Sequence, residues 1–267
     1  MARRADPERY NLESVARTAS VLYALETESG RALDQVAADT GLSDSTALRY
    51  LSSLITQGLV ERDPATGTYA LGLTLFRLGA SAVQQRNVGR IAAPYFQRLL
   101  EDLQESVNLA ARRADQVLVL EVHQSARSLR KGVTAGGIDS WHATSLGKAI
   151  LAALPGAEVA HLVGEAPFPE FTPNTLTDLD ALVRDLAGTR ARGFAIDDEE
   201  TEEGLRCVGV AIRDHTGAPV YAVSVSGPKS RMSFPRLSAI GDRLVDDVES
   251  ISQGLGFRAG GSLSQAD

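Results

Sequence analysis

Cysteine is almost absent from this sequence of 267 residues, in which Cys207 is the only one. A single cysteine excludes an internal disulfide framework and fits a reducing compartment. No apolar run approaches the roughly 20 residues that a membrane-spanning helix needs. The polar first residues, 1–14, also lack the apolar stretch of a signal peptide. We therefore expect a cytoplasmic protein with no membrane partner.

An excess of positive charge is lacking as well, because 27 Lys and Arg residues stand against 34 Asp and Glu residues, a net charge of -7. Phosphate binding needs local Lys and Arg, so this balance argues at first sight against a nucleic-acid partner. Residues 1–90, however, hold ten arginines and ten acidic residues, so the whole net charge lies beyond residue 90. Charge alone does not establish DNA binding.

The hydrophobic content of 43% is that of a globular protein with one or two domains, and its pattern begins with three helices. Apolar residues at helical spacing predict a first helix over 12–25. A short second helix over 33–40 ends at Gly41, because glycine most easily takes the left-handed conformation at a helix exit. Ser43 is a good N-cap for a third helix over 44–57. The three predicted helices are thus separated by short turns.

A hairpin is predicted directly after the third helix. Residues 59–62 and 68–71 are typical of strands, and the segment 63–67 between them is rich in turn formers. Three helices with a glycine turn between the second and third, followed by a hairpin, are the order of a winged helix-turn-helix. Two further helical segments, 73–85 and 88–103, predict a linker, with interruptions at 87–89 and at Pro94, which suits an early helical position better than an interior one.

Strands and helices alternate in the rest of the chain, which predicts an α+β domain. We expect the last helix to begin at the cap Ser233, and the helix at 178–192 to be capped by Thr177 and ended by Gly193. No internal repeat is present. The predicted strands are 107–113, 116–123, 194–198, 208–213 and 219–226, and the predicted helices are 146–154, 178–192 and 234–255.

The chain resembles the IclR-type bacterial transcriptional regulators over residues 10–256, in five motifs that follow one another in the expected order. The resemblance implies a winged helix-turn-helix, a linker helix used in dimerisation and a GAF-like α/β effector domain. One departure is Asp44, where a neutral or basic residue is expected near the phosphates. The motifs are Gly-Leu-Ser-Asp-Ser-Thr-Ala-Leu-Arg at 41–49, Gly-Thr-Tyr-Ala-Leu-Gly at 67–72, His-Ala-Thr-Ser-Leu-Gly-Lys-Ala at 142–149, Asp-Asp-Glu-Glu at 197–200 with Gly204 and Cys207, and Val-Ser-Val-Ser-Gly-Pro at 223–228.

Four parts of the chain are therefore expected. They are a DNA-binding domain at 1–85, a linker and dimerisation helix at 86–105, an effector-binding domain at 106–256 and a flexible tail at 257–267. The expected partners are operator DNA, a small carboxylate effector and a second copy of the chain, in a homo-dimer or a dimer of dimers. We expect no cofactor, and a protein that acts as a repressor.

The predicted DNA-binding residues lie at the start of the third helix and on the wing. A helix in the major groove presents its N-terminal residues to base edges, and Arg49 can bridge two acceptors of guanine or grip a phosphate. The alternative interpretation is that such arginines only make an exposed surface soluble and contact no DNA. Arg3 and Arg4 in the leader could also reach DNA. The candidate residues are Ser43, Ser45, Thr46, Arg49, Tyr50 and Arg62.

The predicted effector site starts from strand geometry, because a period of two places Ser224 and Ser226 on one face of their strand. The resemblance implies that 2-oxo acids such as glyoxylate or pyruvate bind there, and a helix N-terminus suits a carboxylate. Asp197 would repel an anion unless it is protonated or its charge is absorbed by hydrogen bonds. The residues that the resemblance implies are Ser145, Leu146, Asp197, Cys207, Ser224 and Ser226.

Other interpretations remain at this point. Cys207 could be the nucleophile of an enzyme with Asp197 and a histidine as its base system, although no motif places His161 or His215 beside it. The effector could be a larger aromatic or sugar acid, and a purely structural interaction module is a third alternative. The four histidines lack metal-like spacing, and residues 197–200 are by default a solvated turn, so no metal is expected.

Overall fold

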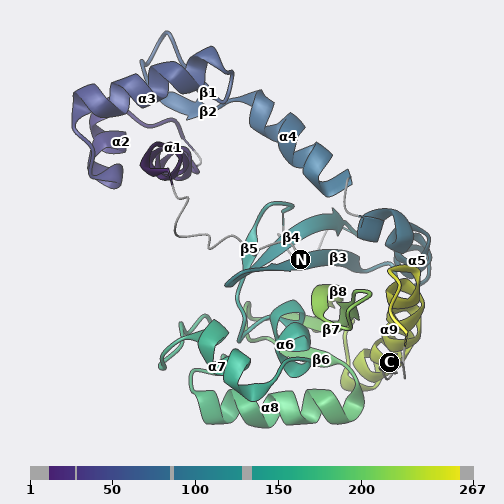
Figure 1. The fold of residues 1–267 in the computed structure, drawn as a ribbon. Helices are drawn as coiled ribbons and strands as arrows, with labels where there is room; N and C mark the ends of the chain where they lie inside the picture. The colour runs from purple at the N-terminus through teal and green to yellow at the C-terminus, as the bar shows by residue number, and fades with distance from the viewer. Residues whose placement is uncertain (1–11, 28, 85–86, 128–133, 259–267) are drawn as a thin grey trace, which may run out of the picture. The chain divides into compact units, whose positions relative to one another are not determined.

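The computed structural model describes residues 12–27, 29–84, 87–127 and 134–258 of the chain. It divides into two compact units, Met1–Gln85 and Arg86–Asp267 (Figure 1). Arg3 and Arg4 in the leader, and most of the predicted tail, lie outside the described residues. Each unit is described by itself.

The first unit has the predicted order of three helices, a hairpin and a further helix. Gly41 ends the second helix in the left-handed conformation with a φ of 66°. At the start of the third helix the Ser43 side chain accepts a hydrogen bond from the Thr46 amide at 3.4 Å. Both predicted helix boundaries are therefore confirmed. The elements are α1 (Glu13–Ala24), α2 (Leu33–Thr40), α3 (Asp44–Thr56), β1 (Val60–Arg62), β2 (Tyr69–Leu71) and α4 (Leu73–Gln84).

A small apolar core holds this unit together. Helices α1, α2 and α3 contribute the buried sides of their amphipathic stripes, and the hairpin closes the core with Val60 and Tyr69. Tyr69 also pairs its backbone with Arg31, whose amide donates to the Tyr69 carbonyl at 2.8 Å. The wing is thus fixed to the start of α2 as well as to α3. The buried cluster is Val21, Leu25, Val36, Leu51, Leu54, Val60 and Tyr69.

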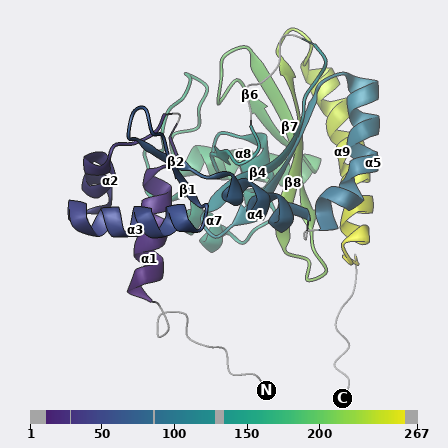
Figure 2. The same ribbon diagram turned by 90° about the horizontal axis from the view of Figure 1, so that it is seen from above.

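The second unit is built on one antiparallel sheet of six strands, in the order β5-β4-β3-β8-β7-β6. Helices α5 and α9 lie side by side on one face, and α6, α7 and α8 lie on the other (Figures 1 and 2). The bounds are α5 (Asn87–Leu103), β3 (Ser106–Arg113), β4 (Gln116–His123), β5 (Ile138–Asp139), α6 (Ser145–Ala152), α7 (Gly156–Val163), α8 (Leu179–Arg192), β6 (Ala195–Asp198), β7 (Leu205–Arg213), β8 (Pro219–Pro228) and α9 (Phe234–Gly254).

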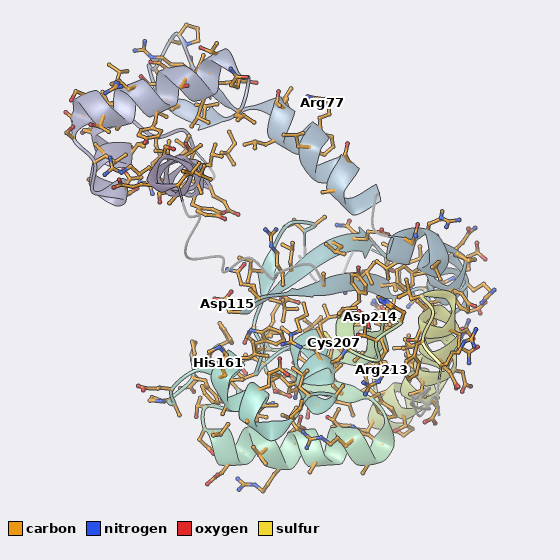
Figure 3. All side chains as sticks on the ribbon, viewed as in Figure 1. Arg77, Asp115, His161, Cys207, Arg213 and Asp214 are labelled. Atoms are coloured by element: carbon orange, nitrogen blue, oxygen red, sulfur yellow. The ribbon has the colours of Figure 1, made fainter. Side chains whose placement is uncertain are left out.

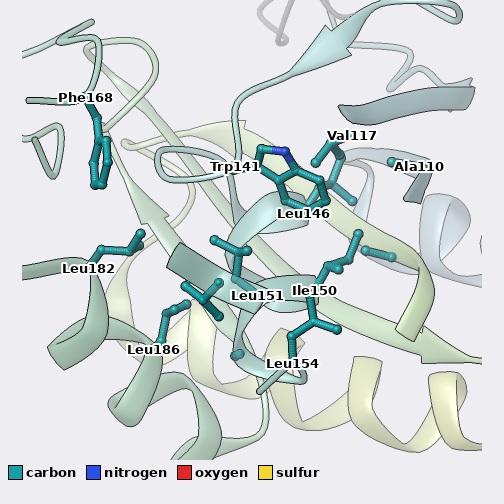
Figure 4. Close-up of a cluster of buried hydrophobic side chains, with 13 residues drawn as sticks. Ala110, Val117, Trp141, Leu146, Ile150, Leu151, Leu154, Phe168, Leu182 and Leu186 are labelled. Atoms are coloured by element: carbon teal, nitrogen blue, oxygen red, sulfur yellow. The ribbon is translucent and has the colours of Figure 1, made fainter. Parts of the chain in front are cut away.

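The main core cluster lies between the sheet and the layer of α6, α7 and α8, as the close-up in Figure 4 shows. Every residue of α6 is buried, which explains why its sequence is apolar on all sides except for Ser145 and Lys148. From the sheet, Ala110 and Ala222 contribute small side chains. Small residues at these positions let α6 approach the strands closely.

Several predicted boundaries differ from the structure. The cap of α8 is Asp178, whose carboxylate accepts from the Ala181 amide at 2.7 Å, and Thr177 is not the cap. Pro94 does not interrupt α5 but lies inside it. The buried apolar face of α5 packs against the sheet and α9, and this packing outweighs the backbone hydrogen bond that proline cannot make.

Strand β7 begins at Leu205, three residues earlier than predicted, because Leu205 pairs with Pro228 across the hairpin. The sequence also gave no prediction for β5 or α7. Strand β5 has only two residues, and α7 has eight, so neither shows a full period of its pattern.

Candidate functional site

The exposed side of α3 carries the candidate DNA-binding residues. Ser43, Ser45 and Arg49 are exposed, and Thr46 and Tyr50 are half-buried. A surface hollow of about 410 Å³ lies between α1 and α3 and is lined by Arg17, Thr46, Arg49, Tyr50 and Ser53. The structure therefore adds Arg17, which the sequence analysis missed because only the packing of α1 on α3 brings it near Arg49.

The Ser43 hydroxyl is engaged in capping α3. Its Oγ lies 2.9 Å from Thr46 Oγ1 and 3.2 Å from Ser45 Oγ, in addition to the capping bond. Asp44, the departure noted in the sequence, stands in the first turn of α3. A carboxylate there stabilises the helix because it faces the positive end of the helix dipole. This gives Asp44 a structural role that needs no DNA contact.

Arg62 is held in place on the wing. Its Nε donates to the Gly67 carbonyl at 3.3 Å, and its guanidinium carbon lies 5.6 Å from the centre of the Tyr69 ring. The turn itself is braced by Asp63, whose carboxylate accepts from the Ala65 amide at 2.7 Å. The hydrogen bond from Ala65, together with hydrogen bonds from Thr66, lowers the pKa of the Asp63 carboxyl. The wing thus presents an exposed arginine on an ordered turn.

In the second unit, the sheet register gathers the candidate effector residues of three strands, β6, β7 and β8. Antiparallel partners point to the same face, so Asp197, Cys207 and Ser226 form one row across β6, β7 and β8. Gly209 and Ser224 form the next row. All of these side chains are buried. The alternation predicted for Ser224 and Ser226 is confirmed, because Asn108 of β3 contacts both hydroxyls from the same face.

The N-terminus of α6 lies directly over this face. Gly209 makes the approach possible, because a methyl group at this position would come within 2.7 Å of the Ser145 carbonyl oxygen. Thr144 caps the helix by accepting from the Gly147 amide at 3.0 Å. The amides of Ser145 and Leu146 occupy the first positions of the helix, where no carbonyl within the helix can reach them. The start of α6 therefore lies next to the sheet face that carries Ser224 and Ser226, which we call the serine face.

Asn108 is a site residue that the sequence analysis missed. Its Nδ2 lies 3.3 Å from Ser224 Oγ and 3.1 Å from Ser226 Oγ. The available signal was a polar residue between the apolar residues Val107 and Leu109, but its partners are more than a hundred residues away in the sequence. Ser106 of the same strand pairs with Ser226 in the sheet register, and its hydroxyl accepts from the Ser125 amide at 3.1 Å.

Residues 197–200 are not a solvated turn, and this prediction was wrong. Asp197 lies in the last part of β6 and Glu200 in the turn that follows it, and both are buried. The two Asp197 oxygens accept from the Glu200 amide and from Thr201 Oγ1, both at 2.8 Å. Glu199 takes a positive φ of 61°, which allows the sharp reversal. The charge of Asp197 is thus met by donors of its own turn.

A buried charged cluster stands next to this turn. The Lys148 ammonium, fully buried on α6, lies 2.5 Å from a Glu200 carboxylate oxygen and 3.2 Å from Asp185 Oδ2 of α8. Burial raises the pKa of Glu200 to about 7, and the neighbouring Lys148 opposes this rise. The cluster connects the 197–200 turn with α6 and α8.

A smaller surface hollow of about 220 Å³ adjoins the buried face and is lined by Ile138, Asp139, Ser140, Thr144, Phe171, Thr201 and Glu202. Thr144 and Thr201 belong to both regions, because one caps α6 and the other donates to Asp197. Through these two threonines the hollow adjoins the cap of α6 and the turn that holds Asp197.

The geometry does not assemble a cysteine-based catalytic centre from the residues proposed for it. Cys207 lies in the interior of the second unit with 1% of its surface exposed, and Figure 3 shows it apart from His161. His161 and His215 are both exposed. His142 is buried, which lowers its pKa, and its ring nitrogens are engaged by Ser140 and by the Pro169 carbonyl. Among the described residues no group of three His, Cys, Asp or Glu gathers as a metal site.

Comparison with known proteins identifies the class that this fold and site define. Residues 14–64 match the IclR helix-turn-helix domain, and residues 80–253 match the bacterial transcriptional regulator IclR C-terminal domain. The chain belongs to the IclR family of DNA-binding transcriptional regulators. Its families and curated relatives are regulators, not enzymes, which removes the enzyme alternative.

Individual relatives match almost the whole chain. It is 34% identical to the HTH-type transcriptional regulator BhcR of Paracoccus denitrificans over 92% of this chain and 88% of that protein. It is 31% identical to the HTH-type transcriptional repressor AllR of Escherichia coli over 92% of both. The fold matches an IclR homologue from Microbacterium hydrocarbonoxydans complexed with 4-hydroxybenzoate, with a TM-score of 0.77 and 24% identity, over 90% of this chain and 98% of that one. None of the helices in the described residues is long and apolar enough to cross a membrane.

Proposed function

We propose that the protein is a repressor that binds operator DNA through α3 and the wing, and that a small carboxylate bound under the start of α6 changes its affinity for DNA. The observation that carries this proposal is the buried polar row on the sheet, which faces the free amides of a helix N-terminus. Burying polar side chains in a core costs free energy unless each of them has a hydrogen-bond partner in the protein or in a ligand. The repressor AllR supports the sign of regulation.

The chemistry of the site favours an anion. Hydroxyl groups of Ser224 and Ser226 can donate, and the helix start adds amide donors and a positive dipole end. Asp197 does not oppose this, because its oxygens are already engaged by Glu200 and Thr201. The closely packed surroundings favour a ligand of a few heavy atoms, such as glyoxylate or pyruvate.

A larger aromatic acid is the second candidate. The structural neighbour complexed with 4-hydroxybenzoate favours it, because a related fold there accepts a carboxylate on an aromatic ring. In this chain such a ligand would need the hollow beside Thr144 and Phe171 in addition to the serine face. The two candidates are therefore distinguished by size.

On the DNA side, α3 presents Arg49 beside Ser45 and Thr46, and the ordered wing presents Arg62. A recognition helix places its N-terminal half in the major groove, and an arginine there reads guanine or holds phosphate. Arg17, which lines the same hollow, adds a second positive side chain to this surface. The operator-binding protein is expected in the cytoplasm, where a bacterial chromosome lies.

The test combines ligand binding with one matched pair of variants. Calorimetric titration with glyoxylate, pyruvate and 4-hydroxybenzoate measures the dissociation constants of the parent, Ser224→Ala and the control Ser250→Ala, which changes an exposed serine on α9. Hydrogen bonds to a charged ligand contribute about 1.5 to 3 kcal/mol, so Ser224→Ala should weaken binding by roughly tenfold to a hundredfold. The control should bind like the parent.

The same proteins are then compared in operator mobility shifts with and without the acid that binds. We expect the acid to change operator affinity of the parent, and to do so for Ser224→Ala only at higher concentration. If none of these acids binds, or if Ser224→Ala binds as tightly as the parent, the proposed carboxylate site is wrong. Preference for 4-hydroxybenzoate over both small acids would select the second candidate.

A further inference from the structure

Asn108 lies at the proposed effector site, and the neighbouring hydroxyl groups pair with only one end of its amide. It lies in β3 with 2% of its surface exposed and points to the face that carries Ser224 and Ser226. Its Nδ2 donates to both serine oxygens. Its Oδ1 is buried too, and it accepts no hydrogen bond from the part of the chain that the structure describes.

We infer that Asn108 binds the effector through Oδ1, and that the effector is therefore a small carboxylate that carries a hydroxyl on the neighbouring carbon. A 2-hydroxy acid and the hydrated form of a 2-oxo acid share this chemistry. The inference rests on the proposed carboxylate site and adds the part of the ligand that the serines do not recognise.

The hydrogen bonds from Asn108 leave the protons of Ser224 and Ser226 unused. A hydroxyl that accepts a hydrogen bond still has its own proton to donate. Because Asn108 donates to Ser224 and Ser226, both serines keep their protons for a third group. An acceptor-only group such as a carboxylate fits these two donors. Asn108 thus makes both serine hydroxyls donors toward the ligand.

Asn108 Oδ1 is buried and has no donor among the described residues. A buried carbonyl without a donor costs free energy, and a ligand that brings a donor removes this cost. The serine protons cannot serve both the ligand carboxylate and Asn108 Oδ1. Both Asp197 oxygens accept hydrogen bonds within their own turn, from the Glu200 amide and Thr201 Oγ1. A ligand that carries an O–H group on the carbon next to its carboxylate supplies the missing donor, while its carboxylate accepts from the two serines.

Glycolate and acetate are the matched probes, because they differ by the single hydroxyl group. A site that hydrogen-bonds a ligand hydroxyl discriminates strongly against the analogue that lacks it, because a buried polar group is then left unpaired. We expect the parent to bind glycolate at least about tenfold more tightly than acetate in calorimetric titration. Lactate and pyruvate give a second pair, in which the hydroxy acid should be preferred because pyruvate is chiefly unhydrated.

Two variants assign the preference to Asn108. Asn108→Leu keeps the side-chain volume and removes the amide, so the glycolate to acetate ratio should fall toward one. Ser224→Ala should weaken both acids and leave a preference for glycolate. A merely structural role of Asn108 would instead weaken both acids by the same factor.

The outcomes separate this inference from the proposed function. If no acid binds the parent, the carboxylate site itself fails. If acids bind and Ser224→Ala weakens them, but the parent binds acetate as tightly as glycolate, only the role of Asn108 is overturned. The same holds if Asn108→Leu keeps the parent ratio. Should Asn108→Leu not fold, Asn108→Ser is measured in its place, and the ratio of the parent remains decisive.

Discussion

At the scale of single residues, a charged side chain has different consequences on a surface and in a core. Arg49 is exposed on α3, so its guanidinium costs the fold nothing and remains available to a partner. Lys148 and Glu200 are buried, and the Lys148 ammonium lies 2.5 Å from Glu200 and 3.2 Å from Asp185, so neither charge is isolated in the core. The exposed residue can therefore be tested through binding, and the buried pair through stability.

Arg49→Ala should weaken operator binding by about 1 to 3 kcal/mol, because one bidentate base contact or phosphate contact is lost. The fold should stay intact, since removal of an exposed side chain opens no cavity. Mobility shifts at two salt concentrations measure the effect. Arg184→Ala, which removes an exposed arginine from α8, is the control for charge alone. Equal operator affinity of Arg49→Ala and the parent would contradict the assignment.

Glu200→Gln should flatten the pH dependence of stability between about pH 4.5 and 7. Burial raises the pKa of folded Glu200 from 4.5 to about 7, so its favourable contribution is present below pH 4.5 and is lost as the pH rises to about 7. The parent should therefore lose at most about 3 kcal/mol over this window from this residue. Glutamine does not titrate, so the variant should lack that loss.

Urea unfolding at several pH values measures this dependence, with Glu202→Gln as the control for an exposed carboxyl of the same loop. Parallel curves for Glu200→Gln and the parent would show that Glu200 titrates normally in the folded protein.

At the scale of elements, the contact between α6 and β7 depends on the absence of one side chain. A methyl group at Gly209 would lie 2.7 Å from the Ser145 oxygen and 2.9 Å from its carbonyl carbon, both of them backbone atoms. Backbone of a buried helix cannot move aside without disturbing the core around Leu146 and Ile150. The close approach also sets the width of the proposed effector site.

Gly209→Ala should therefore destabilise the protein by about 1 to 3 kcal/mol and weaken carboxylate binding, because α6 is pushed away from the sheet. Gly156→Ala at the start of α7 is the matched control, since an added methyl there meets nothing within 4 Å. It should leave stability unchanged or raise it slightly. Thermal unfolding and titration with the acid measure both effects. A Gly209→Ala protein as stable as the control would show that α6 is free to shift.

At the scale of the whole molecule, the first unit exposes apolar side chains that a monomer would not need. Leu73 and Phe76 on α4 are 77% and 76% exposed, and Val15 and Tyr23 on α1 are exposed as well. Symmetric winged-helix regulators place two recognition helices on two half-sites. We predict that the exposed face of α4 is covered by a second copy of the chain.

Phe76→Asp should accordingly lower the molar mass measured by light scattering from a dimer or tetramer toward the monomer, because a charge would be buried at the interface. Val183→Asp changes an exposed apolar residue of α8 and should leave the mass unchanged. Operator affinity should fall together with dimer formation. A parent protein that is monomeric both free and on DNA would overturn the prediction.

The sequence by itself was sufficient for features that depend on neighbours within one or two turns. Helices α2 and α3 were predicted with their glycine exit and serine cap because those signals act within four residues. The alternation of Ser224 and Ser226 follows from the strand period alone. The order of these local signals, together with five motifs, was enough to recognise the family.

The tertiary structure alone decided which distant residues meet and which are buried. Asn108 contacts serines 116 and 118 positions away, and the Lys148 ammonium meets Glu200 across 52 positions. The run at 197–200 looked solvated because four acidic residues usually face water, but Asp197 and Glu200 are buried and paired. Burial and long-range pairing come from the packing of strands and helices against one another, and a one-dimensional pattern holds no record of that packing.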